Sequence, residues 1–307
     1  MSRDGNKTAG SKSWCCRRWT ELSAAAVRWG FGPGRWLLAG LALIAVACGS
    51  TEAPDRPSEV AFLLDGMFLA PPVEASGPLL LCGRFEVTRG EFFGTAEASG
   101  DLEPDLPVTM VNREEAQAWA RDRGLRLPTL REWRHLAVAG AGGDRRFPWG
   151  PAFRPAAANT LELGLHRPLP VGVFELGKPL WGGYDFAGNV WEWVAAEAAA
   201  DPNHPAGTAL ACGGSFANSG AAAHVLSTRA MHAEDKAVDV GFRYVGEAET
   251  WLAEQVLPLW AQGKPADRRF LLRAISRWRP DLRKMLAEKL QDRLPGPLLE
   301  ALREAGN

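Results

Sequence analysis

The chain has 307 residues, a formal net charge of −1 and 46% hydrophobic residues. A near-neutral chain has no global attraction for nucleic acid, so nucleic-acid binding is not expected. The 13 Trp, 33 Gly and 22 Pro indicate many turns with bulky aromatic rings packed among irregular segments, which is not the composition of a helical bundle.

Residues 1–48 predict an export signal. The run WLLAGLALIAVAC (36–48) is too short for a comfortable membrane span and follows two arginines, Arg28 and Arg35. Small residues precede Cys48, as in the cleavage box of bacterial lipoproteins. We therefore expect a lipidated Cys48 and a membrane-anchored lipoprotein on the periplasmic or cell-surface side. Plain secretion and an uncleaved anchor helix are the alternatives.

The folded part is predicted to begin near residue 60, after a flexible polar tether at 49–59. Apolar and β-branched runs at 60–69 and 79–88 predict two strands that a proline- and glycine-containing loop joins. Residues 89–93 are expected to start a helix.

Two main helices are predicted from capping signals. Asn112 and Glu115 have capping-box spacing before a helix over 113–123, and Thr129 and Glu132 have the same spacing before a helix over 130–138. Within the second segment we expect a partly buried Arg126–Glu132 ion pair, with Trp133 packed in the core.

Loops, two late strands and a helical tail are expected for the rest of the chain. Tryptophans alternate with glycines between 140 and 188, which indicates loops pinned by aromatic rings. Strands are predicted at 211–216 and 240–245. From 247 to 307, apolar residues recur at helical spacing, which predicts two or three amphipathic helices. Docking of this tail on the main domain or a partner is favoured over a position on a membrane.

Five cysteines occur, at positions 15, 16, 48, 82 and 212, and only Cys82 and Cys212 fall in the predicted folded part. The two could pair in an oxidising compartment. Two separately buried thiols are favoured, since nothing in the sequence fixes the distance between them.

Eight sequence blocks in a fixed order resemble the formylglycine-generating-enzyme, or sulfatase-modifying-factor, family. They are FEVTRGEFF (85–93), PVTMVNREEAQAWA (107–120), RLPTLREWRHLA (126–137), FPWG (147–150), PVGVF (170–174), YDFAGNVWEWV (184–194), GGSF (213–216) and GFRYV (241–245). The resemblance implies, for residues 60–246, an α+β variant of the C-type lectin fold that is rich in loops and has few short strands.

The same resemblance implies a structural calcium site in YDFAGNVWEWV. By position, its ligands would be the side chains of Asp185 and Glu192 and the backbone carbonyls of Gly188 and Val190. Carboxylates and carbonyls around a turn suit a hard cation. The equally weighted alternative is that Asp185 caps the turn and Glu192 pairs with an arginine such as Arg243.

Catalysis by the family's known chemistry is not expected. Family enzymes oxidise a cysteine of a client sulfatase with two copper-binding cysteines after the GGS block, and those positions fall near Asn218 and Ala223 here. Cu(I) requires soft thiolate ligands, so neither copper nor formylglycine-generating activity is expected. His224 and His232 lie in the same segment, but their spacing matches no metal motif.

Fold analogy also implies a ligand pocket in this segment, lined by Asn218, Ser219, His224, Ser227 and Arg229. The leading hypothesis is a pseudoenzyme: a non-catalytic lipoprotein that uses the family scaffold to bind, or assemble with, an unknown protein or peptide. The runner-up is an enzyme of the same superfamily that modifies an exported peptide through residues other than cysteine. A lectin-like receptor is a third hypothesis.

Overall fold

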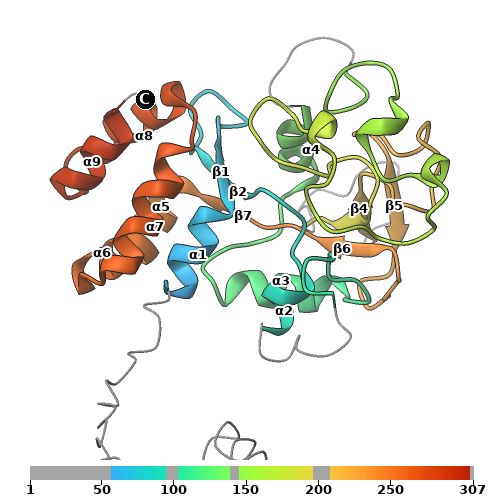
Figure 1. Ribbon diagram of the computed structural model, residues 1–307, viewed down its shortest axis with the longest axis horizontal. Helices are drawn as coiled ribbons and strands as arrows, with labels where there is room; N and C mark the ends of the chain where they lie inside the picture. The colour runs from blue at the N-terminus through green and yellow to red at the C-terminus, as the bar shows by residue number, and fades with distance from the viewer. Residues whose placement is uncertain (1–56, 95–102, 139–144, 196–207, 305–307) are drawn as a thin grey trace, which may run out of the picture. The chain divides into compact units, whose positions relative to one another are not determined.

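The computed structural model describes residues 57–94, 103–138, 145–195 and 208–304 (Figure 1). All of them belong to one compact unit, Glu52–Asn307. The export signal, Cys48 and most of the tether lie outside the described residues, so these assignments stay predictions. No helix in the described part of the chain is long and apolar enough to span a membrane.

The first element of the described residues is a helix where a strand was predicted. Helix α1 (Glu59–Asp65) begins at Ser58, whose side chain accepts a hydrogen bond from the Ala61 amide. Strand β1 (Met67–Ala70) follows only after Gly66. The prediction of one strand over 60–69 was therefore wrong in its first half, because the Ser58 cap favours a helical turn that the apolar run alone does not reveal.

Three antiparallel strands form the first sheet, in the order β1-β2-β7. They are β1, β2 (Leu80–Gly83) and β7 (Val245–Glu247). The strand predicted over 79–88 ends early, at Gly83. Helix α2 (Arg89–Phe93) follows, as expected, and a Thr88–Glu91 capping box opens it.

The second sheet has the strand order β5-β4-β3-β6. Its strands are β3 (Trp191–Trp193), β4 (Ala209–Cys212), β5 (Thr228–Met231) and β6 (Val240–Phe242). Strands β3 and β5 were not predicted. Only Arg243 and Tyr244 separate β6 from β7, so the chain passes from one sheet to the other at Arg243.

The two main helices were predicted correctly. Helix α3 (Arg113–Arg121) has the Asn112–Glu115 capping box, and helix α4 (Leu130–Val138) follows Thr129. Between 145 and 190 the described chain contains turns and three short 3-10 segments, which agrees with the loops predicted there. The fold class is α+β, as expected.

The tail is a run of helices that shares the main core. It contains α5 (Ala248–Trp251), the π-helical segment η5 (Leu252–Val256), α6 (Leu257–Gln262), α7 (Pro265–Ser276), α8 (Pro280–Leu290) and α9 (Gly296–Arg303). Helix α7 packs beside α1, and α8 contacts β1 (Figure 1). The indole of Trp278 donates to the Met67 carbonyl at 3.3 Å. The tail is thus docked on the domain, with more helices than the two or three predicted.

The two cysteines of the folded part lie on different sheets. Cys82 on β2 and Cys212 on β4 are both buried, and no disulfide joins them, as the favoured reading predicted. Burial raises the pKa of the Cys82 thiol to about 12. At neutral pH this thiol is therefore protonated and a poor metal ligand.

Candidate functional site

A buried ion pair occupies the centre of the YDFAGNVWEWV block. Arg243 donates from Nε to Glu192 Oε2 and from Nη2 to Oε1, both at 2.5 Å. The Trp133 indole donates to Glu192 Oε2 at 2.6 Å. Both residues of the pair are 0% exposed, so the carboxylate faces three fixed donors with no water between them. The predicted alternative, an ion pair between Glu192 and Arg243, is the arrangement found.

Arg243 also joins the surrounding segments. Its guanidinium donates to the backbone carbonyls of Gly83 at 3.3 Å and Tyr184 at 2.8 Å. It lies 3.7 Å from the centre of the Phe186 ring. Because β6 ends immediately before it, this one side chain connects both sheets with the loop that precedes β3.

Asp185 binds a different loop from the one expected. Its Oδ2 accepts a hydrogen bond from the Gly172 amide at 2.7 Å, so it anchors the PVGVF segment instead of capping its own turn. Asp185 has φ 60, a left-handed conformation that Asp and Asn tolerate. Burial raises the pKa of this carboxyl to about 6.

A further buried carboxylate, Glu86, escaped the sequence analysis. It is 0% exposed and accepts hydrogen bonds from the Val190 amide at 3.1 Å and from Asn189 Nδ2 at 2.6 Å. Burial, together with the charges of Asp185 and Glu192, raises its pKa well above the usual value. Nothing in the FEVTRGEFF pattern marks Glu86, because its partners lie more than 100 residues later.

In this arrangement, protein donors occupy the Glu192 carboxylate that a calcium ion would need. Arg243 and Trp133 already occupy the Glu192 carboxylate, and the described residues hold no group of three or more His, Cys, Asp or Glu side chains able to bind a metal. Calcium binding by Asp185, Gly188, Val190 and Glu192 therefore stays a prediction.

An Asp185→Asn variant tests two interpretations of the Asp185 carboxyl: a buried group with a raised pKa, and a calcium ligand. The folded-state pKa lies above the ordinary value, so its stabilising contribution is full below pH 4 and is lost as the pH rises through about 6. In a buffer that contains a calcium chelator, the free energy of unfolding of the variant should exceed that of the wild type by about 1–3 kcal/mol at pH 7.5. This difference should vanish near pH 4. Urea unfolding across this pH range measures it. The exposed Asp105→Asn variant is the control.

Lower stability of Asp185→Asn at every pH would contradict the pKa argument. A loss that appears only with added calcium would instead support the calcium site.

The segment after GGS is packed closed at the two family cysteine positions. Ala223 is fully buried, and a Cβ added at Gly214 would lie 2.7 Å from its methyl group. Asn218 Oδ1 accepts hydrogen bonds from the Ser215 amide at 3.0 Å and from Ser215 Oγ at 2.9 Å. One position is therefore filled by a methyl group in the core, and the other closes a tight turn.

Four of the five predicted pocket residues are held by hydrogen bonds or an ion pair within their own segment, and the pocket itself stays a prediction. Arg229 pairs with Asp239 at 3.0 Å and braces the segment. His224 Nδ1 accepts from the Leu226 amide at 3.2 Å, and Ser227 donates to the Ala222 carbonyl. None of the five lines either of the two clefts described here and below. Burial and the nearby Arg146 and Arg134 lower the pKa of His224, which keeps the imidazole neutral.

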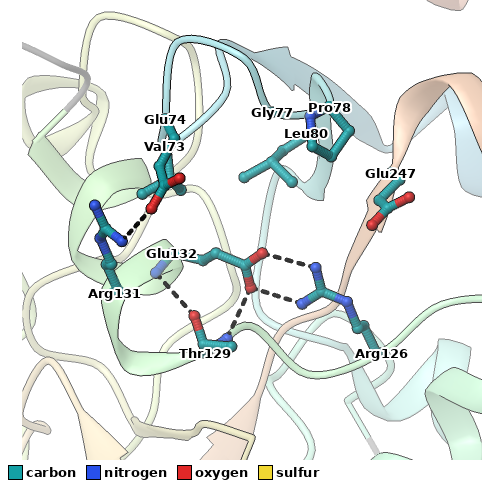
Figure 2. A pocket seen from close by; sticks show the side chains of 10 residues that line it. All are labelled: Val73, Glu74, Gly77, Pro78, Leu80, Arg126, Thr129, Arg131, Glu132 and Glu247. Atoms are coloured by element: carbon teal, nitrogen blue, oxygen red, sulfur yellow. Dashed lines mark hydrogen bonds and ion pairs between the residues drawn. The ribbon is translucent and has the colours of Figure 1, made fainter. Parts of the chain in front are cut away.

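A small cleft of about 280 Å³ lies beside the start of α4 (Figure 2). Four of its five charged residues form two ion pairs. Arg126 binds Glu132 through two hydrogen bonds at 2.6 and 2.7 Å, which confirms the predicted ion pair. Arg131 pairs with Glu74 at the rim. Burial alone would raise the pKa of Glu132, but the hydrogen bonds from Arg126 and Thr129 lower it. Glu247 also lines the cleft and accepts a hydrogen bond from Thr250, so the lining carries two arginines and three carboxylates.

Comparison with known families decides the assignment. The family model for the sulfatase-modifying factor enzyme 1-like domain matches residues 83–248. The chain belongs to this family. Membership confirms the predicted formylglycine-generating-enzyme variant of the C-type lectin fold.

Curated relatives of this sulfatase-modifying-factor domain differ in activity. Hercynine oxygenase of Mycolicibacterium thermoresistibile is 40% identical over 106 residues, which are 34% of this chain and 23% of the relative. The inactive C-alpha-formylglycine-generating enzyme 2 of Bos taurus is 37% identical over 103 residues, 30% of this chain and 34% of the relative. The formylglycine-generating enzyme of Streptomyces coelicolor is 38% identical over 104 residues, 29% and 32% respectively. Each match spans about a third of the relative or less.

Solved structures with a similar arrangement include Treponema denticola variable protein 1, with a TM-score of 0.48 and 18% identity over 59% of this chain and 94% of that chain. PvdO from Pseudomonas aeruginosa has a TM-score of 0.44 and 22% identity over 59% of this chain and 90% of that chain.

The folded unit extends beyond both ends of the family match. Its match begins at the end of β2 and ends at the start of α5. Strand β1, which pairs with β2, and the tail helices, which share its core, lie outside the match. The flanking segments are therefore part of the folded unit.

Proposed function

We propose that this protein is an exported, lipid-anchored member of the sulfatase-modifying-factor family that binds or assembles with a protein or peptide and does not generate formylglycine. The observation that carries the proposal is the pair of residues Asn218 and Ala223 at the family cysteine positions. Neither side chain can form the thiolate that Cu(I) requires.

The packing of the segment supports a non-catalytic role. The Ala223 methyl is buried against Gly214, and the half-buried Asn218 is bonded to Ser215, so both side chains are engaged within the protein. The thiols of the described residues belong to Cys82 and Cys212, which are buried in the core. The family holds both active enzymes and relatives named as inactive.

The sequence before the domain supports export and anchoring. The apolar run ending at Cys48 and the polar tether after it would attach the domain to a membrane through a lipidated cysteine, on the periplasmic or cell-surface side. Calcium bound at Asp185 and Glu192 is proposed only as a structural addition, for which Glu192 would have to leave Arg243.

Metal analysis of the purified full chain by inductively coupled plasma mass spectrometry tests the proposal. We expect no stoichiometric copper, iron or zinc and no conversion of cysteine to formylglycine in a sulfatase-type peptide supplied with Cu(I). The Streptomyces coelicolor formylglycine-generating enzyme is the positive control. Intact-mass analysis of the same preparation should show a lipidated Cys48 that a Cys48→Ser variant lacks.

Stoichiometric iron or zinc that is lost in a His224→Ala/His232→Ala variant would overturn the non-catalytic role and favour the enzyme alternative. An unmodified mature N-terminus other than Cys48 would overturn the lipid anchor.

A further inference from the structure

A larger cleft, of about 620 Å³, lies where α1, the turn after β2 and the end of α7 meet. This volume is within the range of small-molecule sites. Its lining includes residues on both sides of the family match as well as residues within it: Phe62, Asp65, Arg84, Phe85, Tyr184 and Arg277. Figure 1 shows α1 beside α7, which brings the two flanks together. The cleft is thus a feature of the whole folded unit.

Positive charge exceeds negative charge at one end of this cleft. Asp65 is the carboxylate there, and two arginines share it: Arg273 at 2.6 Å and Arg277 at 2.8 Å. A third arginine, Arg84, is half-buried and has no carboxylate partner in the described chain. Its one hydrogen bond is a long one, 3.5 Å, to the Met67 carbonyl. Two guanidinium groups therefore bind the Asp65 carboxylate, and a third, that of Arg84, lies close enough to feel its charge.

Among these three arginines, Arg84 has the least compensated charge. Burial and the nearby charge of Arg277 lower the pKa of Arg84 from its usual value. The Asp65 carboxylate opposes this shift, but Arg273 and Arg277 already bind it, and a half-buried cation with only a shared carboxylate nearby is stabilised when a further anion approaches it. Guanidinium groups bind carboxylate and phosphate through paired N–H donors. An oxyanion from outside the chain would supply the negative charge that is missing beside Arg84.

Aromatic side chains form the adjoining wall. The Phe85 and Tyr184 rings lie 5.1 Å apart, and Phe85 packs against Gly172, where a Cβ would lie 2.4 Å from the Phe85 ring. Phe62 adds an exposed ring, with 53% of its surface accessible. A ligand that carries an apolar or aromatic body next to its anionic group would cover this exposed surface.

Acidic residues limit what the opposite side accepts. Glu91 and Asp105 line the cleft near the Thr88 cap, where the Glu91 carboxylate accepts from the Thr88 amide at 2.8 Å. A ligand with a second anionic group at that side would be repelled. The cleft therefore favours a ligand with one anionic end.

We propose that this cleft binds a small organic anion, with its carboxylate or phosphate received by Arg84 and Arg277. The apolar body of the ligand lies against Phe62, Phe85 and Tyr184. This inference goes beyond the function proposed above, because the cleft lies outside the segment after GGS and does not depend on whether that segment catalyses a reaction.

Isothermal titration calorimetry of the full chain with three matched probes tests the site. Benzoate and phenyl phosphate carry the two candidate anions on the same ring, and benzamide is the neutral counterpart of benzoate. We expect at least one of the anions to bind, at least tenfold more tightly than benzamide, and to weaken at higher salt. The tighter of the two identifies the anionic group.

Arg84→Gln should weaken binding of that anion at least tenfold, and Phe62→Ser should weaken it several-fold. Arg131→Gln, which removes an exposed arginine at the other cleft, should have no effect. Arg84→Gln should keep the wild-type unfolding midpoint, because only one long hydrogen bond is lost. Phe62 is exposed, so its variant provides a second test if Arg84→Gln does not fold.

The proposal is overturned if neither anion binds the wild-type chain at millimolar concentration, if benzamide binds equally well, or if Arg84→Gln and Phe62→Ser both bind like the wild type. None of these outcomes bears on metal content or lipidation, so a failure here is distinguishable from a failure of the proposed function.

Discussion

Replacing Arg243 with leucine is expected to lower the free energy of unfolding by about 3–5 kcal/mol, because it leaves the Glu192 carboxylate buried without its counter-ion. Arg243 and Glu192 are both 0% exposed and share two hydrogen bonds of 2.5 Å. The variant also removes donors to the Gly83 and Tyr184 carbonyls. Urea unfolding followed by tryptophan fluorescence measures the loss.

A double variant and a variant of a surface ion pair separate the effect of the buried charge from the other effects of Arg243→Leu. Arg243→Leu/Glu192→Leu should recover part of the loss, since no unpaired charge remains in the core. Arg131→Ala breaks an ion pair of similar length, 2.6 Å, whose side chains are 67% and 64% exposed, and should cost no more than about 1 kcal/mol. Equal losses in Arg243→Leu and Arg131→Ala would mean that burial does not govern this pair.

Local signals in the sequence were sufficient for the helices of the main domain. The capping boxes at Asn112–Glu115 and Thr129–Glu132 join residues three apart, so one short window contains both partners. The same local origin explains the Arg126–Glu132 pair. Helix α1 was misassigned because seven residues with five apolar side chains fit a strand as well as a helix, and the Ser58 cap was overlooked.

The missed strands depend on distant partners. The WEW sequence of β3 is buried at every position. Its edges pair with β4 and β6, Glu192 contacts Trp133 and Arg243, and the Trp193 indole donates to the Val111 carbonyl. Strand β5 is half-buried and has no clear pattern in TRAM; it is formed by pairing with β4. Three- and four-residue strands of this kind are set by tertiary contacts that the sequence does not display locally.

The residues of the candidate sites also divide into those that sequence patterns reveal and those that only long-range contacts bring together. The sequence could name Arg243 as a partner for Glu192 only because the family pattern placed both in recognisable blocks. Glu86, which accepts from Asn189 and Val190, could not be found without the fold. Arg84 and Arg277 approach one another only because α7 returns to pack on α1. A cleft built from both flanks of a family match is invisible to an argument that reads the family blocks alone.

The tail also shows why the family boundaries do not define the folding unit. Trp251 in α5 is 2% exposed, and its indole donates to the Arg123 carbonyl at 3.0 Å. It lies in the same core cluster as Trp119 and Leu125 of the main domain. The first tail helix therefore completes a core that the family match leaves open.

Trp251→Ala is expected to cost about 3–5 kcal/mol of unfolding free energy, because it empties a volume that main-domain side chains cannot fill. Trp251→Phe keeps most of the ring but leaves the Arg123 carbonyl without its donor, so a smaller loss of about 1–3 kcal/mol is expected. Trp149→Ala is the matched control: this half-exposed indole also donates to a backbone carbonyl, that of Ala152 at 2.9 Å, but lies outside the main core.

Urea unfolding of the three variants should therefore rank them with Trp251→Ala as the least stable, and each should unfold in one transition if the tail and domain form a single cooperative unit. A second, earlier transition in Trp251→Ala would show that the tail can detach while the domain stays folded. In that case the Arg84–Arg277 cleft would open with the tail, and anion binding would be lost at the first transition. If instead Trp251→Ala were no less stable than Trp149→Ala, the tail would contribute little to the core, and the family domain would have to be stable without it.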